Sequence, residues 1–210
     1  MDPTLWLTFV AASTALLLIP GPTVLLVLAY AIGQGRRVAV PTALGVAMGD
    51  LIAMSTSLLG LGALILASAT LFAIIKWAGA LYLIWLGVRM IRSAGSAAPE
   101  LARQTGEITP RAAFLNAATV TALNPKSIAF FIAFVPQFLS PSAPLLGQSL
   151  VLIATFVGLA AVNALAYALL ADRMRTAIKR PAVIAWLTRA GGAALIAMGV
   201  ATATLRRAAS

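Results

Sequence analysis

Residues 78–88 of the chain read AGALYLIWLGV, and residues 190–200 read AGGAALIAMGV. Six of the eleven aligned positions are identical, at an offset of 112 residues. Two further pairs of segments match in the same order: 45–50 with 158–163, and 9–20 with 114–125. One such match between alanine-rich helices arises easily by chance, but three collinear matches indicate an internal duplication.

The composition around these repeats is that of a membrane protein. Of the 210 residues, 61% are hydrophobic and 10% are charged, and the mean hydropathy is +1.01. Soluble domains carry about 25% charged residues, so the composition argues against a water-soluble fold. A helix needs about 20 apolar residues to cross a bilayer. Six such runs are present: about 4–32, 38–59, 66–90, 112–139, 146–171 and 182–205.

Each half of the duplication contains three of these runs, which is an odd number. The second half therefore enters the membrane from the opposite face, and such inverted repeats are typical of secondary transporters. We predict an all-α integral membrane protein with six transmembrane helices. Residues 1–92 form the first repeat, residues 93–111 a cytoplasmic loop, and residues 112–210 the second repeat. Gly60 and Gly62 predict a turn between the second and third helices.

Positive charge gathers on one side of this arrangement. The net charge is +10, and the loops after the first, third and fifth runs hold most of it: Arg36, Arg37, Arg92, Arg103, Arg111, Arg173, Arg175, Lys179 and Arg180. The positive-inside rule places these loops in the cytoplasm and both termini outside. The basic residues form no helical face and do not interleave with aromatic residues, so we expect no nucleic-acid partner.

Prolines interrupt two of the six runs at equivalent places in the repeat. Pro20–Gly21–Pro22 lies within the first run and Asn124–Pro125–Lys126 within the fourth, with Pro20 aligned to Pro125. Proline removes a backbone donor, and an unsatisfied backbone group costs several kcal/mol in hydrocarbon unless protein or cavity water satisfies it. We interpret the two sites as functional breaks in the first and fourth helices; the alternative is a packing kink.

Two charges lie far from any helix end. Asp50 is near the middle of the second run and Lys126 near the middle of the fourth, while Asp50 aligns with the uncharged Asn163. A charge at mid-membrane costs about 2.5–3.5 kcal/mol on insertion scales, so such residues usually face a cavity, form a pair or carry protons. We predict that Asp50, Lys126 and Asn163 line a transport path. A purely structural ion pair between Asp50 and Lys126 is the alternative.

Glycines and missing residue types narrow the chemistry further. Gly45 and Gly49 form a small-xxx-small pair before Asp50, which predicts close helix packing. The same role is predicted for Gly79, Gly87, Gly191 and Gly199. The chain has no histidine or cysteine and only five carboxylates, so no metal site and no cofactor is expected.

Three motifs resemble those of the LysE/RhtB family of amino-acid exporters. They are Ile19–Pro20–Gly21–Pro22, Gly45-x-x-x-Gly49-Asp50 and Leu123–Asn124–Pro125–Lys126. The match in length and hydropathy covers essentially the whole chain. The resemblance implies export of amino acids or derivatives such as homoserine, threonine or lysine across the bacterial inner membrane. It also implies coupling to the proton-motive force.

The leading interpretation is therefore a secondary active exporter of amino acids or related small zwitterions, not an enzyme. Amino-terminal ends of broken helices favour a carboxylate. Asp50 would meet the substrate ammonium or a coupling proton, and Lys126 a carboxylate or Asp50 itself. A metal-ion exporter of similar architecture is the alternative, although one intramembrane carboxylate is few for a cation. An intramembrane enzyme and a scaffold stay open as minor alternatives, as does a homo-oligomer.

Overall fold

The computed structural model describes residues 2–19, 21–34, 37–94, 108–140, 143–178 and 181–204. This part of the chain is helical and contains no strand, which confirms the predicted all-α class. The helices are α1 (Pro3–Leu18), α2 (Pro22–Gln34), α3 (Ala39–Ala67), α4 (Ala69–Arg92), α5 (Pro110–Ala122), α6 (Pro125–Ala133), the 3-10 helix η3 (Val135–Phe138), α7 (Leu145–Ile178) and α8 (Pro181–Thr204).

Three of these helices contain segments that are long and apolar enough to cross a membrane. The segments are Ala39–Gly62 of α3, Thr70–Arg92 of α4 and Leu145–Ala171 of α7. Two bent pairs also qualify, α1 with α2 at 56° and α5 with Pro125–Phe138 at 45°, so the described residues hold up to five spans. The sixth predicted span, about 182–205, falls on α8. The count of six stays a prediction.

Both predicted breaks separate helices where the prolines indicated. Pro22 and Pro125 each occupy the first position of a helix, where the missing proline N–H would have no partner in any case. Asn124 caps α6, because its side-chain Oδ1 accepts a hydrogen bond of 3.0 Å from the backbone N–H of Lys126. Pro20 lies outside the described residues.

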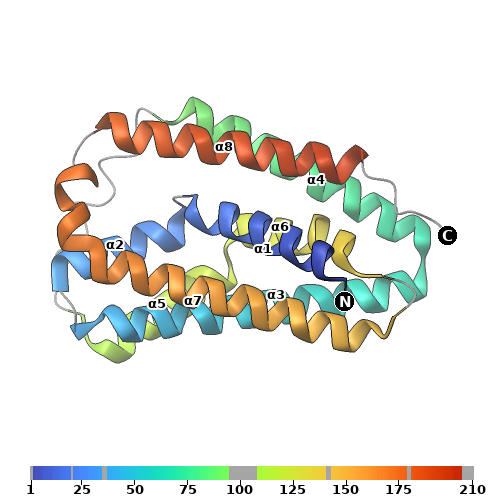
Figure 1. The fold of residues 1–210 in the computed structure, drawn as a ribbon, viewed down its shortest axis with the longest axis horizontal. Coiled ribbons are helices and arrows are strands. Elements are labelled where there is room, and N and C mark those ends of the chain that lie inside the picture. Colours follow the sequence, from blue (N-terminus) through green and yellow to red (C-terminus); the bar gives the residue numbers. More distant parts are fainter. Residues whose placement is uncertain are drawn as a thin grey trace.

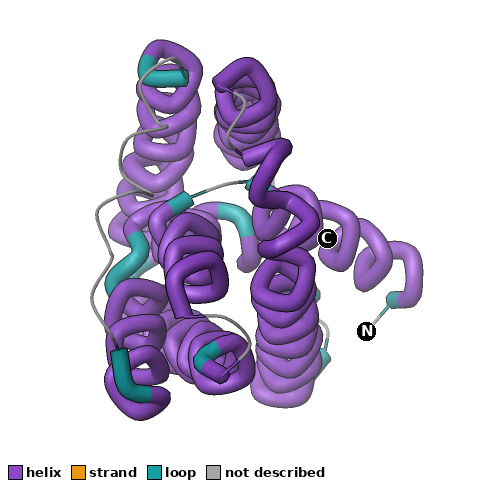
Figure 2. Tube along the Cα trace, turned by 90° about the vertical axis from the view of Figure 1, so that its left-hand side faces the viewer, coloured by secondary structure: helices purple, strands orange, loops and turns teal. Residues whose placement is uncertain are grey.

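Figure 1 shows that the helices form three layers. Helices α4 and α8 lie side by side at the top, α3, α5 and α7 lie at the bottom, and the short helices α1, α2 and α6 lie between them. The view along the long axis of the molecule shows the same division (Figure 2). The half-helices α1, α2 and α6 thus lie between the pair α4 and α8 and the group α3, α5 and α7.

Close glycine contacts join α4 to α8. A Cβ on Gly87 would collide with the carbonyl oxygen of Gly192, and a Cβ on Gly192 would lie 2.6 Å from the carbonyl oxygen of Gly87. Gly199 faces the carbonyl oxygen of Ala80 in the same way, at 2.7 Å. In the repeat alignment Gly87 corresponds to Gly199 and Gly192 to Ala80. The same contact therefore occurs twice, with the roles of the two halves exchanged.

Gly45 and Gly49 pack α3 against α5. A Cβ on Gly45 would collide with the carbonyl oxygen of Phe114, and a Cβ on Gly49 would lie 2.6 Å from both Ala118 O and Thr121 Cβ. The small residues let the two backbones approach closely, as small-xxx-small pairs do in membrane helices. This contact fixes the height at which Asp50, the next residue, faces the middle layer.

Two predicted boundaries are wrong. Gly60 and Gly62 lie inside α3, because a glycine in a helix costs only about 1 kcal/mol and this helix continues to Ala67. The real start signal is Ser68, whose side chain accepts a hydrogen bond of 3.2 Å from the N–H of Leu71 and caps α4. Helix α7 also runs on to Ile178, past the apolar end predicted near residue 171.

The start of α1 and the last turn of α8 lie at the same end of the molecule (Figure 1), as two termini on one face of the membrane require. We expect reporter fusions after Arg37, Ala97 and Lys179 to report the cytoplasm, because basic residues surround these points. A fusion after Ser210 is expected to report the outside. A cytoplasmic signal from the fusion at Ser210 would contradict both the orientation and the inverted repeat.

Candidate functional site

The carboxyl end of α1 faces the side chain of Lys126. A helix end leaves backbone carbonyls without intrahelical donors, and at mid-membrane water does not supply them. The Lys126 ammonium donates to the carbonyl oxygens of Leu16 at 3.1 Å and Ile19 at 3.2 Å. Lys126 itself is only 8% exposed. A cation from the second half of the chain thus satisfies a broken helix of the first half.

Helix α7 satisfies the two carbonyls in between. Asn163 Nδ2 donates to Leu17 O at 3.1 Å, and the Tyr167 hydroxyl donates to Leu18 O at 3.2 Å. Asn163 and Tyr167 are four residues apart, so they share one face of α7. The broken end of α1 is therefore held by donors from both α6 and α7.

The second break contacts the first through short polar side chains. Asn124 Nδ2 donates to the hydroxyl of Thr23 at 3.2 Å, and that hydroxyl lies 3.3 Å from the hydroxyl of Thr121. Thr23 belongs to the first turn of α2, and Asn124 is the cap of α6. The amino-terminal ends of the two half-helices therefore meet at one place.

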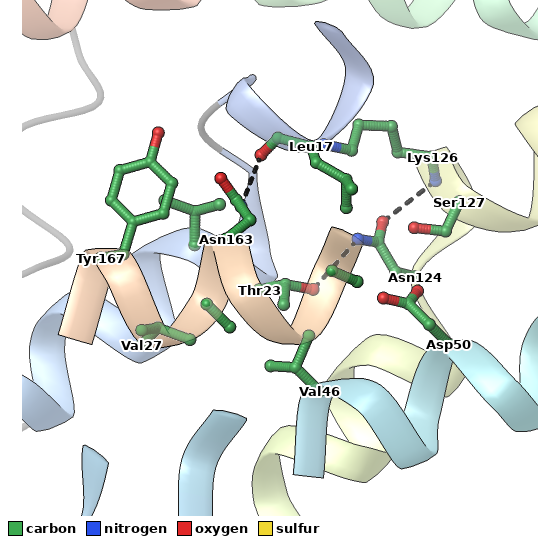
Figure 3. Close-up of a pocket in the computed structure, with 13 residues that line it drawn as sticks. Leu17, Thr23, Val27, Val46, Asp50, Asn124, Lys126, Ser127, Asn163 and Tyr167 are labelled. Atoms are coloured by element: carbon green, nitrogen blue, oxygen red, sulfur yellow. Dashed lines mark hydrogen bonds between the residues drawn. The ribbon is translucent and has the colours of Figure 1, made fainter. Parts of the chain in front are cut away.

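Asp50 lies beside this junction. Its side chain is 2% exposed, and its Oδ1 has no hydrogen-bond partner in the part of the chain that the structure describes. In Figure 3 the carboxylate is directed toward Asn124 and the cavity, while the Lys126 side chain extends away toward α1. The two charges attract each other across the site, but among the described residues the Lys126 ammonium donates to carbonyls and forms no direct ion pair with Asp50.

These groups surround a small cavity of about 30 Å³, which is room for one or two water molecules (Figure 3). Its polar lining consists of Thr23, Asp50, Asn124, Lys126, Ser127, Asn163 and Tyr167. Its apolar lining consists of Leu17, Val24, Val27, Val46, Ala160 and Ala164. An amino acid is larger than this space, so the cavity has no room for one in this conformation.

The cavity has two electrostatic poles. Helix amino-terminal ends carry partial positive charge and favour anions, and carboxyl ends favour cations. The first turns of α2 and α6 supply the positive pole, and the carbonyl end of α1 supplies the negative pole. This arrangement matches a zwitterion, which carries a carboxylate and an ammonium group a short distance apart.

The predicted site residues converge here to a large extent. Asp50, Asn124, Lys126 and Asn163 all line the cavity, and Pro22 and Pro125 begin its two half-helices. Gly21 lies beside the Lys126 side chain, and a Cβ on Gly21 would be 3.3 Å from Nζ. Sequence reasoning missed Thr23, Ser127 and Tyr167. The first two directly follow the break motifs, and Tyr167 follows Asn163 at helical spacing, so both signals were available.

A rigid aromatic cluster holds α6 in place. Phe130 stacks on Phe134 with ring centroids 5.2 Å apart, and Phe131 meets Phe156 of α7 edge-on at 4.8 Å. Phe138 of η3 contacts Phe9 of α1 at 5.3 Å. These contacts tie the helix that carries Lys126 to the helices α1 and α7, so the polar site sits on a packed support.

Comparison with known proteins agrees with this geometry. A family model described as LysE type translocator matches residues 14–206. A homoserine/homoserine lactone efflux protein of Salmonella typhimurium is 37% identical over 206 residues, covering 97% of this chain and 98% of the relative. A leucine efflux protein of Enterobacter sp. (strain 638) is 36% identical over 149 residues, 70% of each chain. No solved structure matches the chain.

Proposed function

The chain belongs to the LysE type translocator family, and from that premise we propose that it exports amino acids or related small zwitterions from the bacterial cytoplasm. The names of two relatives, a homoserine/homoserine lactone efflux protein and a leucine efflux protein, support this direction and substrate class. The apolar helices α3, α4 and α7 support its place in a membrane.

The observation that carries the proposal is the polar cavity with its two electrostatic poles. The substrate carboxylate binds at the first turns of α2 and α6, where Thr23, Asn124 and Ser127 offer polar groups. The substrate ammonium faces the carbonyl end of α1. Binding of both ends at once distinguishes an amino acid from a simple acid or amine of the same length.

The side chain of the substrate is small and uncharged in this proposal. The rest of the cavity is lined by leucine, valine and alanine side chains, with no charged group other than Asp50 and Lys126 among its lining residues. A basic side chain would enter this apolar part without a partner, at a cost of several kcal/mol. Homoserine-like and leucine-like substrates are therefore favoured over lysine.

Transport proceeds by an exchange of roles between the two halves. The paired contacts of Gly87 with Gly192 and of Gly199 with Ala80 support a pseudo-twofold relation between α4 and α8. The α3–α5 contact has no equally close counterpart in the described part of the chain. A Cβ on Gly158, which aligns with Gly45, would meet no described atom within 4 Å. This asymmetry is expected when a pair of inverted repeats rests in one of two access states.

Asp50 is the proposed coupling residue. It is the one carboxylate that the cavity lining contains, it is almost fully buried, and its Oδ1 has no partner within the described ranges. A buried carboxyl group that lacks a fixed partner can take up a proton in one access state and release it in the other. The driving force in this scheme is proton antiport across the inner membrane.

The alternative of a metal-ion exporter is not favoured. Within the described residues no three histidine, cysteine, aspartate or glutamate side chains come together. A hard cation takes six or more oxygen ligands. The single carboxylate of this cavity supplies too few oxygens and too little negative charge to hold one. The family model and the efflux relatives point to organic solutes instead.

The test is transport into everted membrane vesicles that contain the protein. We expect accumulation of labelled homoserine or leucine above vesicles from cells without the protein, and loss of that accumulation on addition of a protonophore. Labelled lysine is expected to accumulate less. No accumulation of any neutral or basic amino acid would remove the proposed function, and accumulation that is insensitive to the protonophore would remove proton coupling.

A further inference from the structure

The position of the Lys126 ammonium is unusual for its own helix. Lys126 is the second residue of α6, where the helix dipole disfavours a positive charge. Its side chain turns away from that end and reaches the carboxyl end of α1, where Leu16 O and Ile19 O accept from Nζ. The carbonyl end of a different helix therefore supplies the favourable field that its own helix lacks.

Gly21 lies beside the end of this side chain. A Cβ at this position would lie 3.3 Å from Nζ and 3.6 Å from Cε of Lys126, so the ammonium would have to shift by a few tenths of an ångström. Gly21 therefore leaves room for a primary ammonium group, carried on an unbranched alkyl chain, at the two carbonyls. We call the two carbonyl oxygens of Leu16 and Ile19 the socket; in this structure it holds the Lys126 ammonium.

We propose that the carboxyl end of α1 is a binding site for a primary ammonium group, filled by Lys126 in this conformation and by the α-ammonium of the exported amino acid during transport. The identity of the second occupant rests on the proposed function; the socket itself does not. The two occupants compete, because Leu16 O and Ile19 O hold one ammonium group at a time.

Withdrawal of Lys126 also accounts for the small size of the site. The cavity of about 30 Å³ has no room for a substrate, and Lys126 is one of the residues that line it, so withdrawal of its side chain widens the space.

The first arm of the experiment tests the socket without any substrate. Lys126→Ala removes Cγ, Cδ, Cε and Nζ, and n-propylammonium consists of the same three carbons and one nitrogen. We expect Lys126→Ala, purified in detergent, to have a lowered thermal midpoint that rises saturably with propylammonium chloride. Sodium chloride and n-propanol are the controls, and neither is expected to raise the midpoint.

Lys126→Met is the matched variant, because methionine fills the space without the charge. Neither Lys126→Met nor the wild-type protein is expected to respond to propylammonium. The absence of a response specific to Lys126→Ala would overturn the socket. If Lys126→Ala fails to accumulate in cells, growth with propylammonium is expected to restore its yield, and a failure to do so while Lys126→Met accumulates would also overturn it.

The second arm tests the competition. If Lys126 leaves the socket free about a tenth of the time, its removal raises the apparent affinity for leucine or homoserine about tenfold. The analogues 4-methylpentanoate and 4-hydroxybutyrate, which lack the ammonium group, are expected to gain nothing. An affinity that falls in Lys126→Ala would show that Lys126 holds the carboxylate, and would overturn the second occupant. Propylammonium rescue of Lys126→Ala, together with no binding of any amino acid to the wild-type protein, would refute the proposed function and leave the socket standing.

Discussion

Asp50→Asn is expected to abolish proton-driven export while the protein stays folded and inserted. Asparagine keeps the shape of the side chain and removes only its ability to carry a proton or a charge. Because the Lys126 ammonium donates to Leu16 O and Ile19 O, it does not depend on Asp50 for its hydrogen bonds. The substitution therefore leaves no buried ammonium without partners, and the fold is expected to survive.

Two transport modes separate coupling from binding in this variant. Net accumulation in everted vesicles is expected to fall to the level of vesicles without the protein. Exchange of labelled for unlabelled substrate at equal concentrations needs no net proton movement and is expected to persist. Asp50→Glu keeps the carboxyl group and serves as the control that retains part of the net activity. Protonophore-sensitive accumulation at the normal rate in Asp50→Asn would contradict the coupling role.

The double variant Asp50→Asn with Lys126→Met tests whether these two residues form a structural ion pair. A buried pair that loses one partner is destabilised by about 3–5 kcal/mol, and removal of both charges restores stability. Here Lys126 has its own carbonyl acceptors, so we expect Asp50→Asn with Lys126→Met to be no more stable than Lys126→Met alone. Full recovery of thermal stability and of efflux in the double variant would favour the ion pair.

Much of the site was predictable from local signals. Asn124 followed by Pro125 is a cap followed by a first-turn proline, and both act within one turn of a helix. Gly45, Gly49 and Asp50 were predictable because glycine spacing and a mid-membrane charge have direct physical costs. These signals arise within single helices, so they can be recognised from one sequence alone.

The partners of these residues were not predictable in the same way. Lys126 binds the carbonyls of Leu16 and Ile19, which lie more than a hundred positions earlier in the chain and carry no polar side chain. Any residue has a backbone carbonyl, so no residue type marks these acceptors. They became acceptors because α1 ends there and tertiary packing brought α6 beside it, although Leu16 O also accepts from the N–H of Ile19 at 3.2 Å. The turn predicted at Gly60 and Gly62 was wrong for a different reason. Glycine favours turns locally, but here the surrounding helix continues through both positions.

Gly158→Leu is expected to leave the protein folded and to stop transport. In the repeat alignment Gly158 corresponds to Gly45, which packs against Phe114 and Ala117 of α5. The equivalents of these two residues in the first half are Phe9 and Ala12 of α1. If the halves exchange roles, α7 closes on α1 in the opposite access state as α3 closes on α5 here. A leucine at position 158 meets open space in this conformation and backbone in the other.

In Gly158→Leu the new side chain therefore blocks the opposite access state and does not destabilise the present structure. Gly45→Leu is the opposite case, because its side chain would meet α5 at once, and overpacking of this kind costs about 1–3 kcal/mol or more. We expect Gly45→Leu to lower the thermal midpoint and the yield, whereas Gly158→Leu keeps both and loses net export and exchange. Gly147→Leu is the matched control on α7: its surroundings are also open, and it lies near the start of the helix, outside the segment 158–163 that aligns with 45–50. Gly147→Leu should export normally, and normal export by Gly158→Leu as well would show that α7 does not close on α1 at Gly158.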